Sequence, residues 1–168
     1  LGSLKKIILA NKHVSTIYTD SSYRLLTLFQ DPSTGNIYVT FHHGIGFYDY
    51  ESLSFSVLAG SSQHEFVARE ISPILFYNPR EVVFLCHRKL LIADLTNNRL
   101  RVLDRITNTS SSICSGVEGH LDGDLSSCQL DGPWSLLTVN DVIFVGEYQY
   151  IRSIQGEYHR KPQGFAKY

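Results

Sequence analysis

The stretch Leu91-Ile92-Ala93-Asp94-Leu95-Thr96-Asn97-Asn98-Arg99-Leu100-Arg101-Val102-Leu103-Asp104 decides the fold. An apolar run ends at an Asp, turns through two Asn residues and returns as a strand. An Asp at a strand end can accept hydrogen bonds from the amides of the following turn. Asn tolerates the left-handed backbone of a tight hairpin. The alternation along the second run predicts a strand with two different faces, so the whole stretch predicts a β-hairpin.

Features of this hairpin and its surroundings recur along the chain at a regular interval. Pro79 recurs as Pro133, and Gly60 recurs as Gly116. Short apolar, β-branched and aromatic runs alternate with turn residues, which is typical of an all-β protein. The period of about 54 residues suits a four-stranded β-propeller blade with extended loops. We therefore predict an all-β fold of propeller blades, each a four-stranded antiparallel sheet, that form an incomplete propeller.

The predicted strands divide the chain into two whole blades between two partial ones. We expect residues 1–20 to form the outer strands of a preceding blade, 21–60 one blade, 61–116 a second blade, and 117–168 a partial blade with a C-terminal tail. Such an arc leaves an open sheet edge and an uncovered core. Segments of a longer protein are expected to complete the ring, with further copies of this chain as the alternative. The expected strands are Lys5–Ala10, Val14–Thr19, Arg24–Phe29, Asn36–Phe41, Gly46–Tyr50, Phe55–Ala59, Glu81–Cys86, Lys89–Ala93, Arg99–Leu103, Ser111–Ser115, Trp134–Val139, Val142–Gly146 and Tyr150–Ile154.

Two segments resemble NHL repeats, a family of β-propeller blades. The stretch from Leu91 to Asp104 resembles the family's strand–Asn-Asn-Arg–strand signature. Gly119-His120-Leu121-Asp122-Gly123 followed by Leu130-Asp131-Gly132-Pro133 resembles its inter-blade loop. The resemblance is strong across Val57–Ile154 and weak in the first blade, where His42-His43-Gly44 replaces the turn. It implies a ring of about six blades.

The charge balance disfavours nucleic-acid binding as the main function. The chain has 15 Lys and Arg against 16 Asp and Glu, a formal net charge of −1, whereas a protein that grips phosphates has a basic excess. The local basic concentration is Arg88, Arg99, Arg101 and Arg105. We expect two of these side chains, in alternate strand positions, to be solvated. No apolar run approaches the roughly 18 residues that a membrane span needs.

The cysteines and one sequon point to an oxidising compartment. Cys114 and Cys128 bracket a 13-residue loop, and a disulfide there would stabilise the fold by about 3 kcal/mol. The alternative is two unpaired small apolar side chains. Cys86 is expected to be a buried thiol, or else to bond to another part of a longer protein. Asn108-Thr109-Ser110 is an N-glycosylation acceptor. Together these features predict an extracellular or cell-surface protein.

The sequence carries no recognised catalytic motif, so we predict no catalytic residues, no metal site and no cofactor. The seven His residues lack metal-ligand spacing. Asp94 and Glu147 occupy equivalent blade positions, which indicates a structural role for both. Trp134 is expected to pack between blades. Tyr148, Gln149 and Tyr150 break the repeat and are a candidate protein contact, although simple drift of a turn sequence explains them equally well.

These observations favour a non-catalytic extracellular protein-interaction module within a larger secreted or cell-surface protein. Its partner would be another protein, or other copies or segments of the same protein. A self-assembling filament protein is the structural alternative. The NHL resemblance implies two others: a metal-dependent lyase of the peptidyl-hydroxyglycine amidating type, and an RNA-binding propeller.

Overall fold

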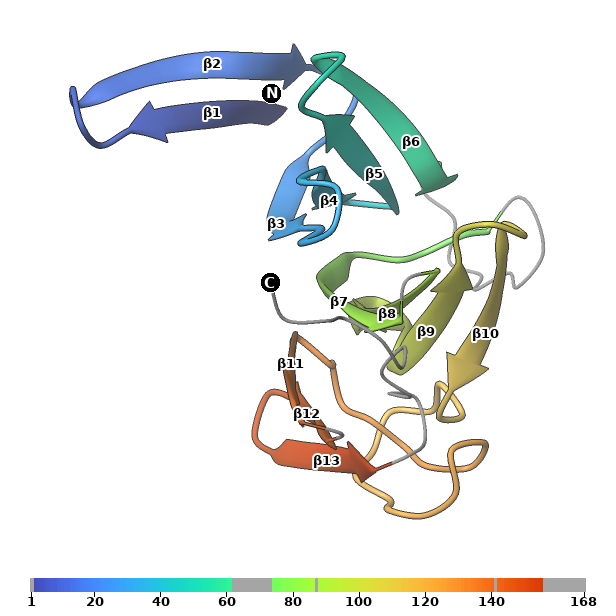
Figure 1. Cartoon of the computed structure of the whole chain (residues 1–168). Helices are drawn as coiled ribbons and strands as arrows, with labels where there is room; N and C mark the ends of the chain where they lie inside the picture. Colours follow the sequence, from blue (N-terminus) through green and yellow to red (C-terminus); the bar gives the residue numbers. More distant parts are fainter. Residues whose placement is uncertain (1, 62–73, 87, 141, 156–168) are drawn as a thin grey trace, which may run out of the picture.

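Thirteen strands and one 3-10 turn make up the regular structure of the described residues (Figure 1). This computed structural model describes residues 2–61, 74–86, 88–140 and 142–155, so histidines 64, 87 and 159 and the predicted C-terminal tail lie outside it. The turn η1 spans Leu95–Asn97. The strands are β1 (Gly2–Ile8), β2 (His13–Asp20), β3 (Leu25–Gln30), β4 (Ile37–Phe41), β5 (Gly44–Asp49), β6 (Ser54–Gly60), β7 (Pro79–Cys86), β8 (Lys89–Asp94), β9 (Arg99–Asp104), β10 (Thr109–Ile113), β11 (Ser135–Val139), β12 (Val142–Gly146) and β13 (Ile151–Gln155).

The strands form four antiparallel sheets in which each strand pairs with its neighbour in the sequence. The sheet orders are β1-β2, β3-β4-β5-β6, β7-β8-β9-β10 and β11-β12-β13. In Figure 1 the last three sheets fan out like blades, with β3, β7 and β11 nearest their common centre and the β1-β2 hairpin projecting from the first. The predicted all-β fold with four-stranded, propeller-like sheets is confirmed.

Strand boundaries differ from the predicted ones where local backbone chemistry decides them. β10 ends at Ile113, two residues before the predicted end, because Cys114 has a φ of 69° and leaves the extended conformation. The strand also begins earlier than predicted. Asp104 accepts hydrogen bonds from the backbone N–H groups of Ile106 and Thr107, which closes a short turn directly after β9.

Two apolar cores lie between successive sheets. One joins β3–β6 to β7–β10, and the other joins β7–β10 to β11–β13. β7 contributes to both because its side chains alternate: Val82 belongs to the first core, and Val83 and Leu85 belong to the second. Burying each such aliphatic side chain contributes about 1.5–3 kcal/mol. The stacking of sheets therefore supplies much of the driving force for folding.

A repeated junction leads into the innermost strands β7 and β11. Asn78 and Gly132, each directly before a Pro, have φ values of 59° and 58°. The Asn78 N–H donates to His42 O at 2.9 Å, and the Gly132 N–H donates to Asn98 Oδ1 at 3.0 Å. In both cases the residue before the Pro is tied to the turn of the preceding sheet. The junction explains why the Pro residues recur at the blade period.

Asp94 and Glu147 anchor this junction in equivalent ways. Asp94 Oδ1 accepts from the backbone N–H of Tyr77 at 2.8 Å, and Glu147 Oε2 accepts from that of Asp131 at 3.1 Å. Both carboxylates are fully buried. The sequence predicted that Asp94 accepts hydrogen bonds from backbone amides of the turn after β8. It accepts instead from the backbone amide of Tyr77 and from the side-chain amide of Asn97. A structural role accounts for both acids.

Arg101 is fully buried, so the expectation that the strand arginines are solvated is wrong for this residue. Its guanidinium lies 3.9 Å from Asp94 Oδ2, donates to Ser110 Oγ and lies over the ring of Phe76. The strand alternation places Arg101 on the face opposite Leu100 and Val102. That face is covered by the preceding sheet, and alternation alone cannot distinguish it from a solvated face.

The pH dependence of stability should report the burial of Asp94. Burial raises the pKa of Asp94 from 3.8 to about 6 in the folded protein. The folded state therefore binds the proton more tightly than the unfolded state, and stability present below pH 3.8 is lost as the pH rises through about 6. We expect the free energy of unfolding to fall across this window in wild type. Denaturant titrations of Asp94→Asn should show a flatter slope there, and an unchanged slope would contradict this assignment.

Candidate protein-contact site

The turn between β12 and β13 presents two aromatic rings to solvent. Tyr148, Gln149 and Tyr150 are all exposed, and 66% of the Tyr148 surface is accessible. The Glu147 N–H donates to Tyr150 O at 2.8 Å, which closes the turn. The sequence-predicted contact residues therefore form one exposed unit. We call Tyr148, Gln149 and Tyr150 the aromatic turn.

Buried charges hold the aromatic turn against the preceding loop. Glu147 Oε1 lies 3.5 Å from Arg152 Nη1, and the other Glu147 oxygen accepts the Asp131 amide. Arg152 also donates to the carbonyl oxygens of Gln129 and Leu121 and pairs with Asp122. These bonds tie both ends of the turn to a loop that lies well before it in the chain. These contacts link the residues on both sides of the aromatic turn to the preceding loop.

Gly132 lets the ring of Tyr148 lie directly on the backbone of this loop. A Cβ atom at position 132 would collide with the Tyr148 ring, and the φ of 58° is one that residues with side chains rarely adopt. This Gly therefore fixes where the first aromatic ring sits, in addition to forming the junction before Pro133.

His120 joins the site, although sequence reasoning treated it as one of several scattered histidines. Its ring centroid lies 4.3 Å from that of Tyr150. Its Nδ1 lies 3.6 Å from Glu147 Oε2, and its Nε2 lies 3.9 Å from Asp131 Oδ2. Each of its two nitrogens thus faces a carboxylate, and the ring lies beside that of Tyr150. The sequence feature that could have pointed to His120 is its position in the inter-blade loop motif, close to Asp122.

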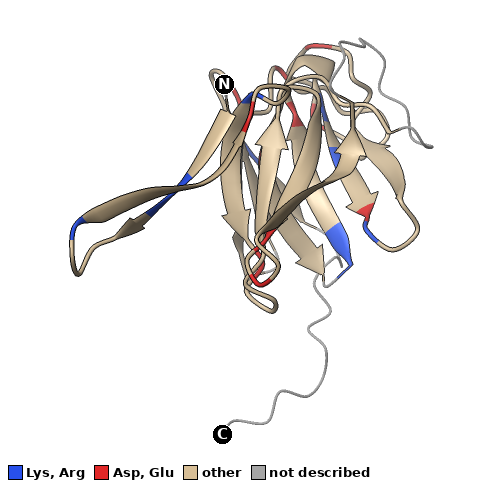
Figure 2. Cartoon of the chain, turned by 90° about the horizontal axis from the view of Figure 1, so that it is seen from above, with Lys and Arg blue, Asp and Glu red and all other residues tan. Residues whose placement is uncertain are grey.

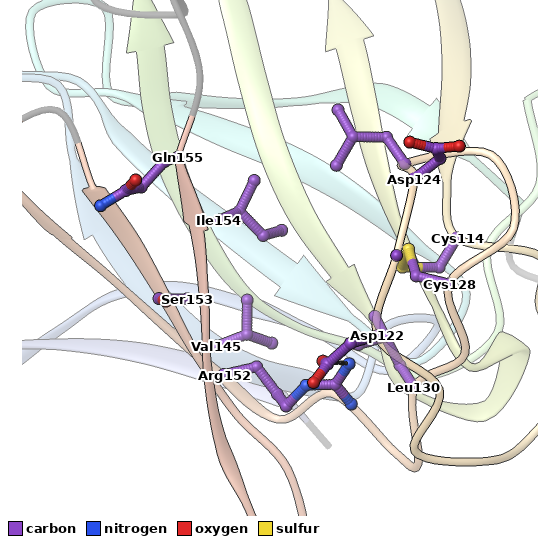
Figure 3. Close-up of a pocket in the computed structure, with 12 residues that line it drawn as sticks. Cys114, Asp122, Asp124, Cys128, Leu130, Val145, Arg152, Ser153, Ile154 and Gln155 are labelled. Carbon is purple, nitrogen blue, oxygen red and sulfur yellow. Dashed lines mark hydrogen bonds and ion pairs between the residues drawn. A yellow bond between two sulfur atoms is a disulfide. The ribbon is translucent and has the colours of Figure 1, made fainter.

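A disulfide joins Cys114 to Cys128 and closes the loop next to the site. Between this loop and β13 lies a cavity of about 270 Å³, shown in Figure 3. Leu130, Val145 and Ile154 line it with apolar surface. The acids of the loop and Arg152 make its polar part, and Arg152 pairs with Asp122 beside it in Figure 3. Arg152 lines the cavity and pairs with Glu147, the residue before the aromatic turn, so the cavity and the turn are linked through this ion pair.

Asn108 lies apart from this site. It is exposed in the turn between β9 and β10. Because successive turns of an antiparallel meander alternate between the two ends of a sheet, this turn is at the opposite end from η1, the counterpart of the aromatic turn. A glycan on Asn108 would therefore leave the end of the blades that carries the aromatic turn uncovered.

The predicted basic concentration is engaged in internal contacts. Arg88 pairs with Asp104, Arg105 pairs with Asp31, and Arg99 donates to Ser112 Oγ and Ser115 O. The Arg88 hydrogen bond lowers the pKa of Asp104 to about 2. Figure 2 shows basic and acidic segments interspersed in that view. These contacts account for the arginines as structural residues.

Two other predicted placements need correction or refinement. Cys86 is exposed, so the expected buried thiol is wrong: it is the last residue of β7, where the pairing with β8 becomes irregular between Phe84 and Cys86. Trp134 is half-exposed and lies outside both cores, so the predicted packing between blades is limited to the Arg80 guanidinium of β7, which lies 4.2 Å from its ring centroid. Among the described residues, no group of three or more His, Cys, Asp and Glu could hold a metal ion. Within that same part of the chain, no helix is long and apolar enough to span a membrane.

Comparison with known proteins identifies relatives of the fold. No protein-family model and no curated protein matches the chain. A Bacteroides thetaiotaomicron protein of unknown function matches 90% of this chain and 41% of its own, at 16% identity and a TM-score of 0.76. An auxiliary nutrient binding protein from that bacterium matches 87% of this chain and 40% of its own, at 16% identity and a TM-score of 0.72.

A third match is the extracellular domain of a candidate hybrid two-component system from B. thetaiotaomicron. The match covers 90% of this chain and 17% of the matched chain, at 16% sequence identity and a TM-score of 0.53. The chain thus spans about 40% of the length of the first two structures. At this identity the matches concern the fold alone. They and the fan of two four-stranded sheets and one three-stranded sheet agree on one conclusion: the chain has a β-propeller-like fold.

Proposed function

We propose that this chain is a non-catalytic, extracellular protein-interaction module of the NHL-like propeller type, within a larger protein, and that the aromatic turn is its contact site. The observation that carries the proposal is the pair of exposed Tyr rings on a turn fixed by buried charges. Tyr is enriched among residues that dominate binding energy. A contact held rigid before binding loses little conformational entropy on association. If the turn sequence had simply drifted, there would be no reason to expect the buried ion pair between Glu147 and Arg152 next to it.

The surroundings of the turn suit a protein partner. The cavity is lined by the apolar side chains of Leu130, Val145 and Ile154 together with the charged Arg152, a combination that suits one anchoring side chain of a partner. The net charge of the chain is −1, so its overall charge gives no electrostatic preference for a strongly charged partner. A partner that stacks on Tyr148 and Tyr150 and inserts an aliphatic side chain beside Leu130 would contact both the aromatic turn and the cavity.

The disulfide and the sequon support an extracellular setting. Disulfides of this kind persist in oxidising compartments. One matched structure is consistent with this setting, since it is an extracellular domain. When the protein is produced in a eukaryotic secretory host, we expect one glycan on Asn108, which is exposed. Glycosidase should shift the electrophoretic mobility of wild type and leave Asn108→Gln unshifted; an unshifted wild type would contradict the assignment.

The contact is tested by replacing the two rings. The double variant Tyr148→Ala, Tyr150→Ala should retain wild-type stability within about 0.5 kcal/mol, as exposed substitutions do. Immobilised wild type, offered secreted and surface proteins of its source cells, should retain a partner that the double variant loses. Quantitative mass spectrometry of the retained proteins provides the measurement.

Leu53→Ala is the matched control for this experiment. Leu53 is 66% exposed, as Tyr148 is, and lies in the turn between β5 and β6 of another sheet. The control should retain the same partner as wild type. Equal retention by the double variant would contradict the proposed contact. Substrate turnover by the native protein, abolished by His120→Ala, would contradict its non-catalytic character.

A further inference from the structure

Burial at one position of the innermost strands depends on whether a preceding blade covers it. Val82 on β7 and Leu136 on β11 face the preceding sheet, and both are buried, Val82 to 2% exposure. Leu28 on β3 is the equivalent of Val82 in the first four-stranded sheet. It pairs with Val39 on β4, just as Val82 pairs with Ile92 on β8. Leu28 is 53% exposed. An apolar residue is thus kept at this position even where no inner strand covers it in the described structure.

The opposite face shows the same contrast at the other end of the arc. We call the side of a sheet that points to the next sheet its trailing face. On β7–β10 the trailing face is buried, with Val83 at 9% and Leu100 at 0% exposure. The equivalent residues of β11–β13 are Leu137 at 60% and Ile151 at 80%. Val139 and Phe144 complete this exposed apolar face, and the four residues line a groove of about 470 Å³.

We propose that in the native protein a further blade of the same polypeptide covers the trailing face of β11–β13. The residue types repeat those of a known interface: aliphatic residues at positions 137, 139 and 151 correspond to Val83, Leu85 and Leu100, which the next sheet buries. A small ligand needs convergent polar groups for its orientation. This groove has almost none, because Ser135 is the one polar side chain among the described residues that line it.

Two observations favour the same polypeptide as the source of that blade. Each interface between blades in this structure joins sheets that follow one another in the chain. The solved chains that share the arrangement are more than twice as long as the part that this chain matches. The inference does not depend on partner binding by the aromatic turn, although this turn directly precedes Ile151, and it goes beyond the proposed contact.

Carbene footprinting of the native protein purified from its source tests this directly. Leu137 and Ile151 should resist labelling, whereas Ile106 and Leu53, exposed in turns of other sheets, should be labelled. The denatured polypeptide should have a mass above 19.0 kDa. Labelling of Leu137 equal to that of Ile106 would overturn the proposal. Protection on a 19.0 kDa polypeptide would also overturn it, because a second copy or another protein would then be the cover.

A pair of charge substitutions gives a second, independent readout. Leu137→Lys should reduce the yield of folded native protein, because the charge would be buried against the next blade. Ile106→Lys, at a position even more exposed in this structure, should leave the yield at the wild-type level. Equal yields of the two variants would contradict the covered face. Loss of the aromatic-turn contact would leave both results unchanged, so failure of one proposal is distinguishable from failure of the other.

Discussion

Replacing Arg101 by Leu is expected to lower the free energy of unfolding by about 3–5 kcal/mol, the range for removing one partner of a buried ion pair. The substitution leaves the carboxylate of Asp94 fully buried without its ion-pair partner, and it removes the guanidinium that donates to Ser110. Asp94 also anchors the Tyr77 amide at the blade junction. Disturbing this residue therefore weakens the contact between two sheets. Chemical denaturation monitored by the fluorescence of Trp134 measures the effect.

Two further variants separate the ion pair from simple loss of packing. Arg88→Leu removes an exposed arginine that also pairs with an Asp, and it should change stability little. The double variant Asp94→Asn, Arg101→Leu should be less destabilised than Arg101→Leu alone, because an amide needs no counter-charge and can still accept from Tyr77. If the single and double variants are equally unstable, the buried charge is not the cause.

Removing the disulfide is the second change with a large expected effect. The double variant Cys114→Ala, Cys128→Ala should lose about 3 kcal/mol, since the unfolded chain regains the entropy of a loop of this length. Thermal unfolding with and without reductant measures it. Reductant should lower the midpoint of wild type to that of the double variant and leave the variant unchanged.

Cys86→Ala is the control for the disulfide. Its thiol is free and exposed, so its replacement should alter neither the midpoint nor the response to reductant. A wild-type midpoint that does not respond to reductant would contradict the disulfide. Opening the loop should also weaken partner binding, because the loop carries Asp122, which pairs with Arg152, two residues after the aromatic turn.

Much of the fold followed from periodicity and turn chemistry. The hairpin around Asn97 and Asn98 forms as predicted, and Asn98 has the left-handed φ of 49° that the turn requires. Alternation correctly assigned Leu100 and Val102 to one face of β9. These features depend on residues close in sequence, where the geometry of the backbone decides the outcome.

The errors concern contacts between distant segments. Arg101 was expected in solvent because the sequence does not say which sheet covers a strand, and Cys86 was expected inside for the same reason. His120 could not be placed in the site, because its contacts with Glu147 and Tyr150 join segments far apart in the sequence and arise from the packing of the inter-blade loop on the next sheet. The aromatic turn was found because it breaks the repeat. Glu147, which supports it, obeys the repeat and was predicted to be structural, but its pairing with Arg152 could not be read from the sequence.

Site-specific photocrosslinking tests the central claim, that the aromatic turn binds another protein. A benzophenone amino acid replaces Gln149, between the two rings, and in a separate sample it replaces Leu53 in the other exposed turn. After irradiation of cells that produce the protein, we expect a defined crosslinked protein from position 149 and none from position 53. No crosslink from position 149, or the same products from both positions, would contradict the account.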